Sequence, residues 1–475
     1  MEKVGILVVC YGSRGVAIAD AFKRSLEYET DLYIVDRQKN PFNARIAKEH
    51  IVIPDLNVNE ICKFVKKWER EIDFGIVGPE KPIIEGIRDL IEAETEIPLI
   101  CPTKKFAIEA SKVEQRNLFQ KAIPEVNPKF KVFDPADYRD VSEVKREVWS
   151  WLDELNNQAV VKPDKPAAGK GVGVWGDHFR SREELFEHFL ANFKYGRVII
   201  EEKLEGEESS FQCFCDGKRI VPLPETRDYK RAFEGDEGPN TGGMGSYKDT
   251  GNILPFMTEK DWDKEIEIAN KIFSELRGKT SNPELRGTPF YIAFIHTAEG
   301  PKILENNSRP GDPEIMNVLP LLKDDFVDLC MRMIDGNLKE PKIEDLASVV
   351  IYKVPPTYGG FNERFPEKVR REELGSPVDL SSAEKLVEKY GGRLRLYPGS
   401  MEVRDGETYA LRSRAVAAVG LGDGIAEARK IALECVEAIR GGALWFRKDI
   451  ASKEHISRSI KRMKTLRKRG GRDKA

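Results

Sequence analysis

Continuous apolar runs alternate with amphipathic stretches over the first hundred residues. Between two of the runs, Ile61, Val65 and Trp68 recur at helical spacing within residues 58–71. Unbroken apolar runs of this length are typical of parallel strands that are buried on both faces. The predicted strands are VGILVV (4–9), LYIV (32–35), FGIVG (74–78) and PLIC (98–101). This order of strand and helix predicts an α/β domain with a parallel sheet over residues 1–105.

The pattern changes after residue 105 to strands separated by long polar segments. The strand AVVKP precedes a glycine loop, and RVIIEEKLEGEESSFQCFCDG reads as two strands around a corner. The segment PETRDYKRAFEGDEGPNTGGMGSY is almost free of aliphatic residues, and loops of that length in compact domains are usually functional. YIAFIHTAEGPKILENNSRPGDPE predicts a hairpin, and a helix over 318–337 follows it. We therefore expect an α+β domain over residues 106–345.

A third domain is predicted over residues 346–452. KVPPTYGGFNERFPEK is rich in Pro and Gly and marks a boundary near residue 350. Beyond it, RAVAAVGLG predicts a strand, and an apolar stripe from Ile425 to Ile439 predicts a helix that packs on a core. The fold class is thus a multidomain α/β and α+β protein.

Composition narrows the class of protein. A chain of 475 residues is too long for one core and suggests roughly two to four domains. No apolar stretch approaches the ~20 residues that cross a bilayer. The seven cysteines lack CxxC spacing, which indicates reduced thiols in a cytoplasmic protein. The five histidines are scattered, so we expect lysine, arginine and carboxylate groups to carry any chemistry.

The C-terminal segment is strongly basic. RSIKRMKTLRKRGGRDKA carries nine Lys or Arg and one Asp. Such a segment can contact nucleic acid or an acidic partner, but charge runs are more often solvated ends. We expect residues 453–475 to be a mobile tail with at most weak contacts, and deletion of residues 456–475 to leave activity intact. The pI of about 6.2 gives no reason to expect nucleic-acid binding by the folded body.

The first strand ends in a glycine turn that precedes a predicted helix. Gly12-Ser-Arg-Gly15 could present backbone amides and Arg14 to a phosphate. A plain strand-to-helix turn explains the same residues equally well. The dinucleotide-binding pattern would need glycine where Cys10 stands, so that reading fails.

A second glycine-rich segment, VVKPDKPAAGKGVGV (160–174), resembles a phosphate loop without matching the Walker pattern. Position 164 is Asp and no Ser or Thr follows Lys170. Lys162 ends the strand before the loop, and Lys170 lies within it. Two cations and free backbone amides suit a polyphosphate. The glycines at 169, 171 and 173 allow a close backbone approach and a loop that can close.

Later segments supply groups that the phosphate loop lacks. Backbone groups from Glu201 to Leu204 lie at a strand end and suit an adenine, and Glu207 or Glu208 could bind ribose hydroxyls. Glu305 and Asn307 lie two apart on one strand, so both face the same side. A carboxylate and an amide oxygen suit Mg²⁺. Arg309 follows on that face and suits a carboxylate or a transferring phosphoryl group.

These segments together resemble the phosphoribosylamine–glycine ligase family of the ATP-grasp superfamily. The resemblance covers nearly the whole chain to about residue 452, and its most specific parts are GPNTGGMG and NSRPGDPE. The matching segments are GPEKP (78–82), CPTKKFAIEASK (101–112), VVKPDKPAAGKGVGV (160–174), IIEEKLEGEESSF (199–211), RDYKRAFEGDEGPNTGGMGSY (227–247), ILENNSRPGDPE (303–314), AVGLGDGIAEA (418–428) and LWFRKDIAS (444–452).

The resemblance implies a Rossmann-like N-terminal domain, a central ATP-grasp domain and a small C-terminal domain. It implies a cytoplasmic ligase of de novo purine (IMP) biosynthesis that uses ATP with Mg²⁺ or Mn²⁺. Its small-molecule substrates would be glycine and 5-phosphoribosylamine. The products would be N1-(5-phosphoribosyl)glycinamide, ADP and phosphate, formed through glycyl phosphate. Such chemistry depends on positioning and charge neutralisation more than on a histidine base.

The resemblance also implies a role for individual residues. Glu305 and Asn307 would bind the metal, and Arg309, Lys230 and Asp312 would be catalytic. ATP would be bound by Lys112, Lys162, Gly169, Lys170, Gly171, Gly173, Glu201, Leu204 and Glu208. The other two substrates would be bound by Gly12, Arg14, Gly78, Glu80, Asp228, Asn240, Gly242, Gly243 and Glu314.

The chain departs from the family pattern at several positions. Gly15 and Val16 follow Arg14 where the family usually has Glu and His. Tyr229 stands where His is common, Asn306 where an apolar residue is common, and Pro310 where Phe is usual. Two other functions therefore stay open: a different ATP-grasp carbon–nitrogen ligase, and a silent nucleotide-binding protein whose tail docks RNA or an acidic partner.

Overall fold

The N-terminal part is a parallel sheet, as the apolar runs predict. A computed structural model describes residues 1–166, 171–359 and 370–472. Its first five strands run in the order β3-β2-β1-β4-β5, and every neighbouring pair is parallel. They are β1 (Glu2–Val9), β2 (Tyr28–Asp36), β3 (Glu49–Val52), β4 (Phe74–Val77) and β5 (Leu99–Ile100). The edge strand β3 is half-exposed and has no continuous apolar run, which is why the pattern did not reveal it.

Helices cover both faces of this sheet. Val8 packs with Phe22 of α1 (Gly12–Lys23) on one face. On the other face, Val9 packs with Ile61 of α3 (Val58–Lys67) and Ile91 of α5 (Ile87–Thr95). The short helix α4 (Glu80–Glu85) follows β4 and begins at one of the residues proposed to bind substrate.

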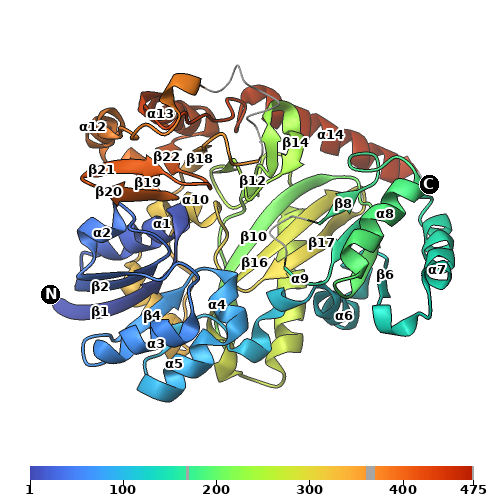
Figure 1. The fold of residues 1–475 in the computed structure, drawn as a ribbon, viewed down its shortest axis with the longest axis horizontal. Coiled ribbons are helices and arrows are strands. Elements are labelled where there is room, and N and C mark those ends of the chain that lie inside the picture. The colour runs from blue at the N-terminus through green and yellow to red at the C-terminus, as the bar shows by residue number, and fades with distance from the viewer. Residues whose placement is uncertain (167–170, 360–369, 473–475) are drawn as a thin grey trace.

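The central part contains two four-stranded sheets (Figure 1). The first has the order β6-β9-β7-β8 and is antiparallel, with α7 (Val141–Glu154) and α8 (Arg182–Phe193) packed on it. Its strands are β6 (Phe130–Phe133), β7 (Ala159–Pro163), β8 (Gly173–Val174) and β9 (Val198–Glu202). The phosphate-loop segment thus connects β7 to β8 at the edge of this sheet.

The second central sheet has the order β11-β10-β16-β17 and is also antiparallel. Helices α6 (Lys112–Ala122) and α9 (Glu259–Arg277) pack on one face around Phe211, Ile268 and Phe294. Its strands are β10 (Glu207–Asp216), β11 (Ile220–Pro222), β16 (Arg286–Thr297) and β17 (Gly300–Asn307). The predicted hairpin corresponds to β16 and β17.

The C-terminal sheet includes two strands from the glycine-rich segment of the central part. Its order is β12-β15-β18-β22-β19, and β15 pairs with β18 antiparallel. The strands are β12 (Arg227–Asp228), β15 (Gly245–Lys248), β18 (Ala347–Lys353), β19 (Leu394–Pro398) and β22 (Val416–Gly422). α12 (Ser381–Tyr390) and α13 (Ile425–Ala438) pack against this sheet, and the predicted apolar stripe lies on α13. The boundaries at 105/106 and 345/346 stay predictions.

Two short hairpins and two helices complete this region. β13 (Arg231–Phe233) pairs with β14 (Glu237–Asn240), and β20 (Met401–Arg404) pairs with β21 (Glu407–Ala410). The helix predicted over 318–337 is divided into α10 (Ile315–Val318) and α11 (Phe326–Asp335). Pro320 lies in the turn between them, and Asp325 caps the second helix through the backbone N–H of Val327.

The expectation of a mobile C-terminal tail is wrong for residues 453–472, and residues 473–475 lie outside the described residues. Residues Lys453–Arg472 form α14, which runs from the C-terminal part toward the central sheets (Figure 1). His455, Ser459, Met463 and Leu466 are buried at helical spacing beneath a basic outer face. The large number of Lys and Arg residues obscured this buried stripe, because they occupy the other positions of the helix. Among the described residues, no helix is long and apolar enough to span a membrane.

Candidate active site

A buried ion cluster joins the two central sheets. The carboxylate of Glu201, at the end of β9, accepts hydrogen bonds from Arg116 Nε at 2.6 Å and Nη2 at 2.9 Å. Lys162 Nζ of β7 lies 2.7 Å from the same carboxylate. Burial raises the pKa of Glu201, but Arg116 and Lys162 bring it down to about 2. Arg116 also donates to the carbonyls of Ile303 and Leu304 in β17, so β7, β9 and β17 are held together.

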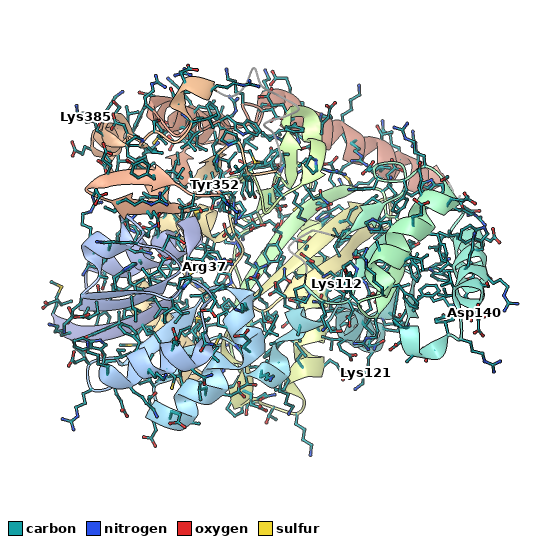
Figure 2. The ribbon with its side chains drawn as sticks, in the orientation of Figure 1. Arg37, Lys112, Lys121, Asp140, Tyr352 and Lys385 are labelled. Carbon is teal, nitrogen blue, oxygen red and sulfur yellow. The ribbon has the colours of Figure 1, made fainter. Side chains whose placement is uncertain are left out.

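Glu305 of β17 lies among cations from four separate segments. Burial raises the pKa of its carboxyl, but the surrounding positive charges lower that pKa overall. The cations are Lys230, Lys112, Lys162 and Arg309. Lys112 lies near the middle of the molecule in Figure 2. The lysine of the phosphate-loop strand and the acid of β17 therefore face a common region, as the hypothesis of a shared triphosphate requires.

Lys230 and two acids form the next part of the site. Lys230 Nζ lies 2.8 Å from Glu208 Oε2 and 3.9 Å from Asp228 Oδ1. Burial raises the pKa of Asp228 to about 7 despite Lys230, and Glu314 contributes to the rise. Burial alone would lower the pKa of Lys230, but Asp228 and Glu208 keep it well above its ordinary value. Lys230 is thus held as a cation between two carboxyl groups.

Glu305 and Asn307 fit the coordination chemistry of a divalent metal ion. Asn307 Nδ2 donates to Glu305 Oε1 at 3.3 Å, which places the amide beside a carboxylate that neighbouring cations keep ionised. Among the described residues, no group of three or more His, Cys, Asp or Glu side chains is arranged to hold a metal. Two oxygen ligands from the protein are what Mg²⁺ uses when phosphates and water complete its shell.

Arg309 is held between two acids beyond the metal pair. Its Nη2 donates to Glu109 Oε1 at 3.0 Å, and its Nε lies 3.9 Å from Glu80 Oε2. Burial raises the pKa of Glu109 to about 6, against the lowering effect of Arg309. Arg14 Nη1 donates to the carbonyl of Pro310 at 2.9 Å. The glycine turn of the N-terminal domain thereby contacts the loop that follows β17.

Two residues of the C-terminal part, Arg414 and Tyr352, contact Asp312 in the loop that follows β17. Arg414 Nη2 lies 2.9 Å from Asp312 Oδ2, and Tyr352 of β18 donates to Oδ1 at 3.0 Å. Arg414 Nη1 also donates to the carbonyls of Gly242 at 2.6 Å and Asp312 at 3.2 Å. The Gly242 amide donates to Tyr358 Oη at 2.8 Å. Arg414 thus holds residues 240–245, called the glycine-rich loop below, against the loop that follows β17.

Comparison with known proteins identifies the family. The N domain of phosphoribosylglycinamide synthetase matches residues 4–109, and the ATP-grasp (A) domain matches residues 126–315. The phosphoribosylamine–glycine ligase of Pyrococcus furiosus is 37% identical over 472 residues, which is 98% of this chain and 98% of that protein. The chain belongs to the phosphoribosylamine–glycine ligase family.

Other relatives agree with this family membership. The phosphoribosylamine–glycine ligase of Thermococcus kodakarensis is 37% identical over 468 residues, covering 97% of this chain and 99% of that one. The crystal structure of the Thermotoga maritima phosphoribosylamine–glycine ligase has a TM-score of 0.70 at 23% identity, over 94% of this chain and 100% of that chain. This likeness confirms the fold: an α/β N-terminal domain, an ATP-grasp domain and a C-terminal α+β part.

The remaining residues expected from the family pattern lie around the same region. Gly12 begins α1 with φ +74°, and a side chain at Gly78 would place Cβ 2.2 Å from Cys10 Sγ, so both positions require glycine. Glu314 is buried and accepts a hydrogen bond from Ser210 Oγ at 3.1 Å. Asn240 ends β14, and Gly243 donates its N–H to Thr241 Oγ1 at 3.0 Å.

The phosphate loop is described only in part. Gly169 and Lys170 lie outside the described residues. The carbonyl oxygen of Gly171 lies 2.8 Å from His188 Nε2, and Gly173 begins β8. Leu204 follows β9 and is half-buried. The binding roles expected for these residues in the family stay predictions.

Three residues that make contacts in the candidate site escaped the sequence analysis. Arg116 and Glu109 lie in or beside the family segment CPTKKFAIEASK, but nothing local shows that their partners are Glu201 and Arg309. Arg414 lies 102 positions from Asp312, within a segment that carries no family motif. Only the fold brings these pairs together, so their charges alone gave no usable signal.

Proposed function

We propose that the chain ligates glycine to 5-phosphoribosylamine at the expense of ATP, using the residues described above. The observation that carries the proposal is the gathering of Lys112, Lys162, Lys230 and Arg309 around the ionised Glu305. Such a concentration of positive charge on both sides of a metal-binding acid suits a triphosphate and the group that receives its terminal phosphoryl.

The first step is phosphoryl transfer. Lys112 and Lys162, with Lys170 of the loop, bind the phosphates, and Arg309 binds the transferring group. A glycine carboxylate oxygen attacks the γ-phosphorus, the bond to the β-phosphate oxygen breaks, and glycyl phosphate and ADP result. Glu305 and Asn307 would hold a divalent ion, which would neutralise charge on the phosphates. Positioning and charge account for most of the catalysis of such a step.

The second step is amine attack. The nitrogen of phosphoribosylamine attacks the glycyl carbonyl carbon, phosphate leaves, and the nitrogen loses a proton to give N1-(5-phosphoribosyl)glycinamide. Asp228 has a pKa near 7, which suits a group that accepts a proton at neutral pH. Lys230 and Arg309 offset the charge that develops on the carbonyl oxygen and on the departing phosphate. Asp312, fixed by Arg414, positions the loop that contacts the substrates.

A coupled assay tests this function. Purified protein with ATP, glycine and Mg²⁺ should release phosphate only when phosphoribosylamine is added, and mass spectrometry should detect the glycinamide product. Equal turnover with a different amine would favour another ATP-grasp ligase, which the Gly15 and Val16 departures keep in view. ATP binding without any turnover would favour a silent nucleotide-binding protein.

The identity of the metal ion and the cellular location belong to the same proposal. Mg²⁺ is proposed because the site offers two oxygen ligands, and Mn²⁺ accepts the same set. Activity after removal of divalent ions, restored by each metal in turn, separates the two. A cytoplasmic location is proposed because all seven cysteines are free and buried, as is typical of proteins in a reducing compartment.

A further inference from the structure

We propose that α14 is a positioning element of the acceptor site, the part of the active site that takes glycine and phosphoribosylamine. It acts through His455 on residues 228–230, which run from the end of β12 to the residue before β13 and are called the acceptor segment below. The proposal rests on the proposed function only for the role given to Asp228 and Lys230. The contacts between α14 and the acceptor segment stand independently of it. None of the family motifs extends into α14.

Tyr229 connects the acceptor segment to the C-terminal part. It lies between Asp228 and Lys230 in the sequence, but its side chain contacts His455, whereas Lys230 contacts Asp228 and Glu208. Its ring is buried, and its backbone exchanges hydrogen bonds with the glycine-rich loop: the Tyr229 N–H donates to Gly245 at 2.9 Å, and the Met244 N–H donates to Tyr229 at 2.7 Å. Movement of Tyr229 would therefore shift both sides of the acceptor site.

His455, in the first turn of α14, holds the Tyr229 hydroxyl. Tyr229 Oη accepts a hydrogen bond from the Ala451 N–H at 2.9 Å and lies 3.1 Å from His455 Nδ1. The two rings pack with centroids 4.8 Å apart. The other ring nitrogen, Nε2, lies 2.9 Å from Asp236 Oδ2. One neutral tautomer satisfies all of these contacts: Nε2–H donates to Asp236, and Nδ1 accepts from Tyr229.

Asp236, which His455 contacts, is held in place by two arginines. The fully buried Arg447 donates to Asp236 Oδ1 at 3.1 Å, and Arg458 of α14 donates to Oδ2 at 2.9 Å. Asp236 lies in the turn of the β13–β14 hairpin, whose last residue is Asn240. The same histidine therefore contacts Tyr229 in the acceptor segment and Asp236 in the turn of the β13–β14 hairpin.

The rest of α14 is anchored on different elements. Ser459 accepts a hydrogen bond from Arg227 of β12 at 3.0 Å, and Arg462 lies 3.3 Å from Glu207 of β10. Arg467 donates to Asp261 of α9 at 2.7 Å. These contacts fix the helix on β12, β10 and α9 and thereby fix the position of His455. In this chain the hydroxyl of Tyr229, where the family commonly has His, supplies the link to α14.

The test compares three variants of the full chain. In His455→Ala, we expect KM for phosphoribosylamine to rise about tenfold while ATP affinity, measured by direct titration, changes less than twofold. Hydrogen exchange at the amides of Tyr229 and Met244 should become about tenfold faster. Lys461→Ala, on the exposed face of the same helix, should leave both measurements unchanged.

His455→Asn distinguishes positioning from helix stability. Asparagine keeps an acceptor oxygen near the place of Nδ1, so it should recover most of the exchange protection and of KM. Alanine is the better helix former, so a merely structural role would rank alanine above asparagine. Tyr229→Phe, which removes only the hydroxyl, should reproduce the effect of His455→Ala and add little to it in the double variant.

Two results would overturn the proposal. Unchanged exchange at Tyr229 and Met244 in His455→Ala would show that α14 does not hold the acceptor segment. An equal loss of ATP affinity and amine binding would show general destabilisation instead. If the parent protein lacks ligase activity altogether, the proposed function fails, and the exchange measurement still decides whether α14 positions the acceptor segment.

Discussion

Two buried glutamates, Glu201 and Glu305, differ in how their negative charge is balanced. The charge of Glu201 is balanced directly by Arg116 and Lys162. Among the described residues, Glu305 has no arginine or lysine at ion-pair distance, although several cations act on it from farther away. An acid that is kept ionised but left unpaired is available to a bound cation. We therefore propose that the metal binds Glu305 and that the carboxylate of Glu201 has a structural role.

The first prediction concerns Glu305. Glu305→Gln keeps the shape of the side chain and removes its charge, so turnover should fall by about 100-fold or more while ATP still binds weakly. Steady-state phosphate release and nucleotide titration measure the two effects. Glu299→Gln, an exposed acid in the turn of the same hairpin, serves as the control. Full activity of Glu305→Gln would remove this residue from the metal site.

A second prediction concerns a buried acid pair behind the active site. Glu265 of α9 lies 3.0 Å from His296 Nε2 and accepts from Ser209 Oγ at 3.2 Å, with Glu225 beside it. Burial raises the pKa of Glu265 to about 8, and the pKa of Glu225 also rises. Burial lowers the pKa of His296 to about 4, so this ring is neutral at pH 7.

The sign of the pH dependence follows from the raised pKa. The stabilising contribution of a protonated Glu265 is fully present below its unfolded pKa of about 4.5 and is lost as pH rises through about 8. Between pH 6 and 9 the parent should lose on the order of 1–3 kcal/mol more unfolding free energy than Glu265→Gln. Denaturant titrations at both pH values measure this difference, with the exposed Asp263→Asn as control. Parallel pH profiles would contradict the prediction.

At the scale of elements, α14 shows that a basic composition does not determine whether a segment folds onto the protein. Its inward positions carry Met463, Leu466 and Ser459, and its charges lie outward or pair with acids on other elements. The helical spacing of Ile456, Ile460 and Met463 was visible in the sequence. The density of Lys and Arg outweighed that signal, although an amphipathic helix can have both features.

The third prediction tests the packing of this helix. Met463 is fully buried, so Met463→Ala should lower the free energy of unfolding by about 2–5 kcal/mol through lost contacts and a cavity. Lys464→Ala, its exposed neighbour, should change stability by less than about 0.5 kcal/mol. Equal stability of the two variants in denaturant unfolding would mean that α14 is not packed in solution. Deletion of residues 456–475 should likewise destabilise the protein, contrary to the expectation from charge alone.

At the scale of the whole molecule, local sequence patterns were sufficient to locate many of the helices and strands. They were insufficient to predict which strands pair and how the domains pack. Apolar runs located β1, β2, β4 and β5, because burial on both faces leaves a continuous signature. Nothing local indicated that β15 pairs with β18, since both strands are short and their partners lie about a hundred residues apart. The motifs gave Glu305 and Asn307 of β17 and Arg309 shortly after it, which lie within five residues of one another in the sequence. They could not give Arg414, whose role depends on how the domains pack.

The fourth prediction concerns that packing. Arg414→Lys keeps the charge but removes the planar fork that contacts Asp312 and Gly242, so kcat/KM for the amine should fall about tenfold to a hundredfold. Initial rates at varied phosphoribosylamine measure the change. Arg412→Lys, exposed two positions earlier, should retain parent activity. Equal rates for both variants would show that the C-terminal domain does not shape the acceptor site.

The C-terminal sheet contains strands from both the central and the C-terminal parts of the chain, which limits where the gene can be divided. A fragment that stops at residue 345 would lose β18 and leave β15 with an open row of backbone donors and acceptors. Unprotected strand edges of this kind recruit other chains. We expect such a fragment to aggregate when it is produced alone, and to stay dispersed when the complementary fragment is synthesised in the same cell and pairs with it.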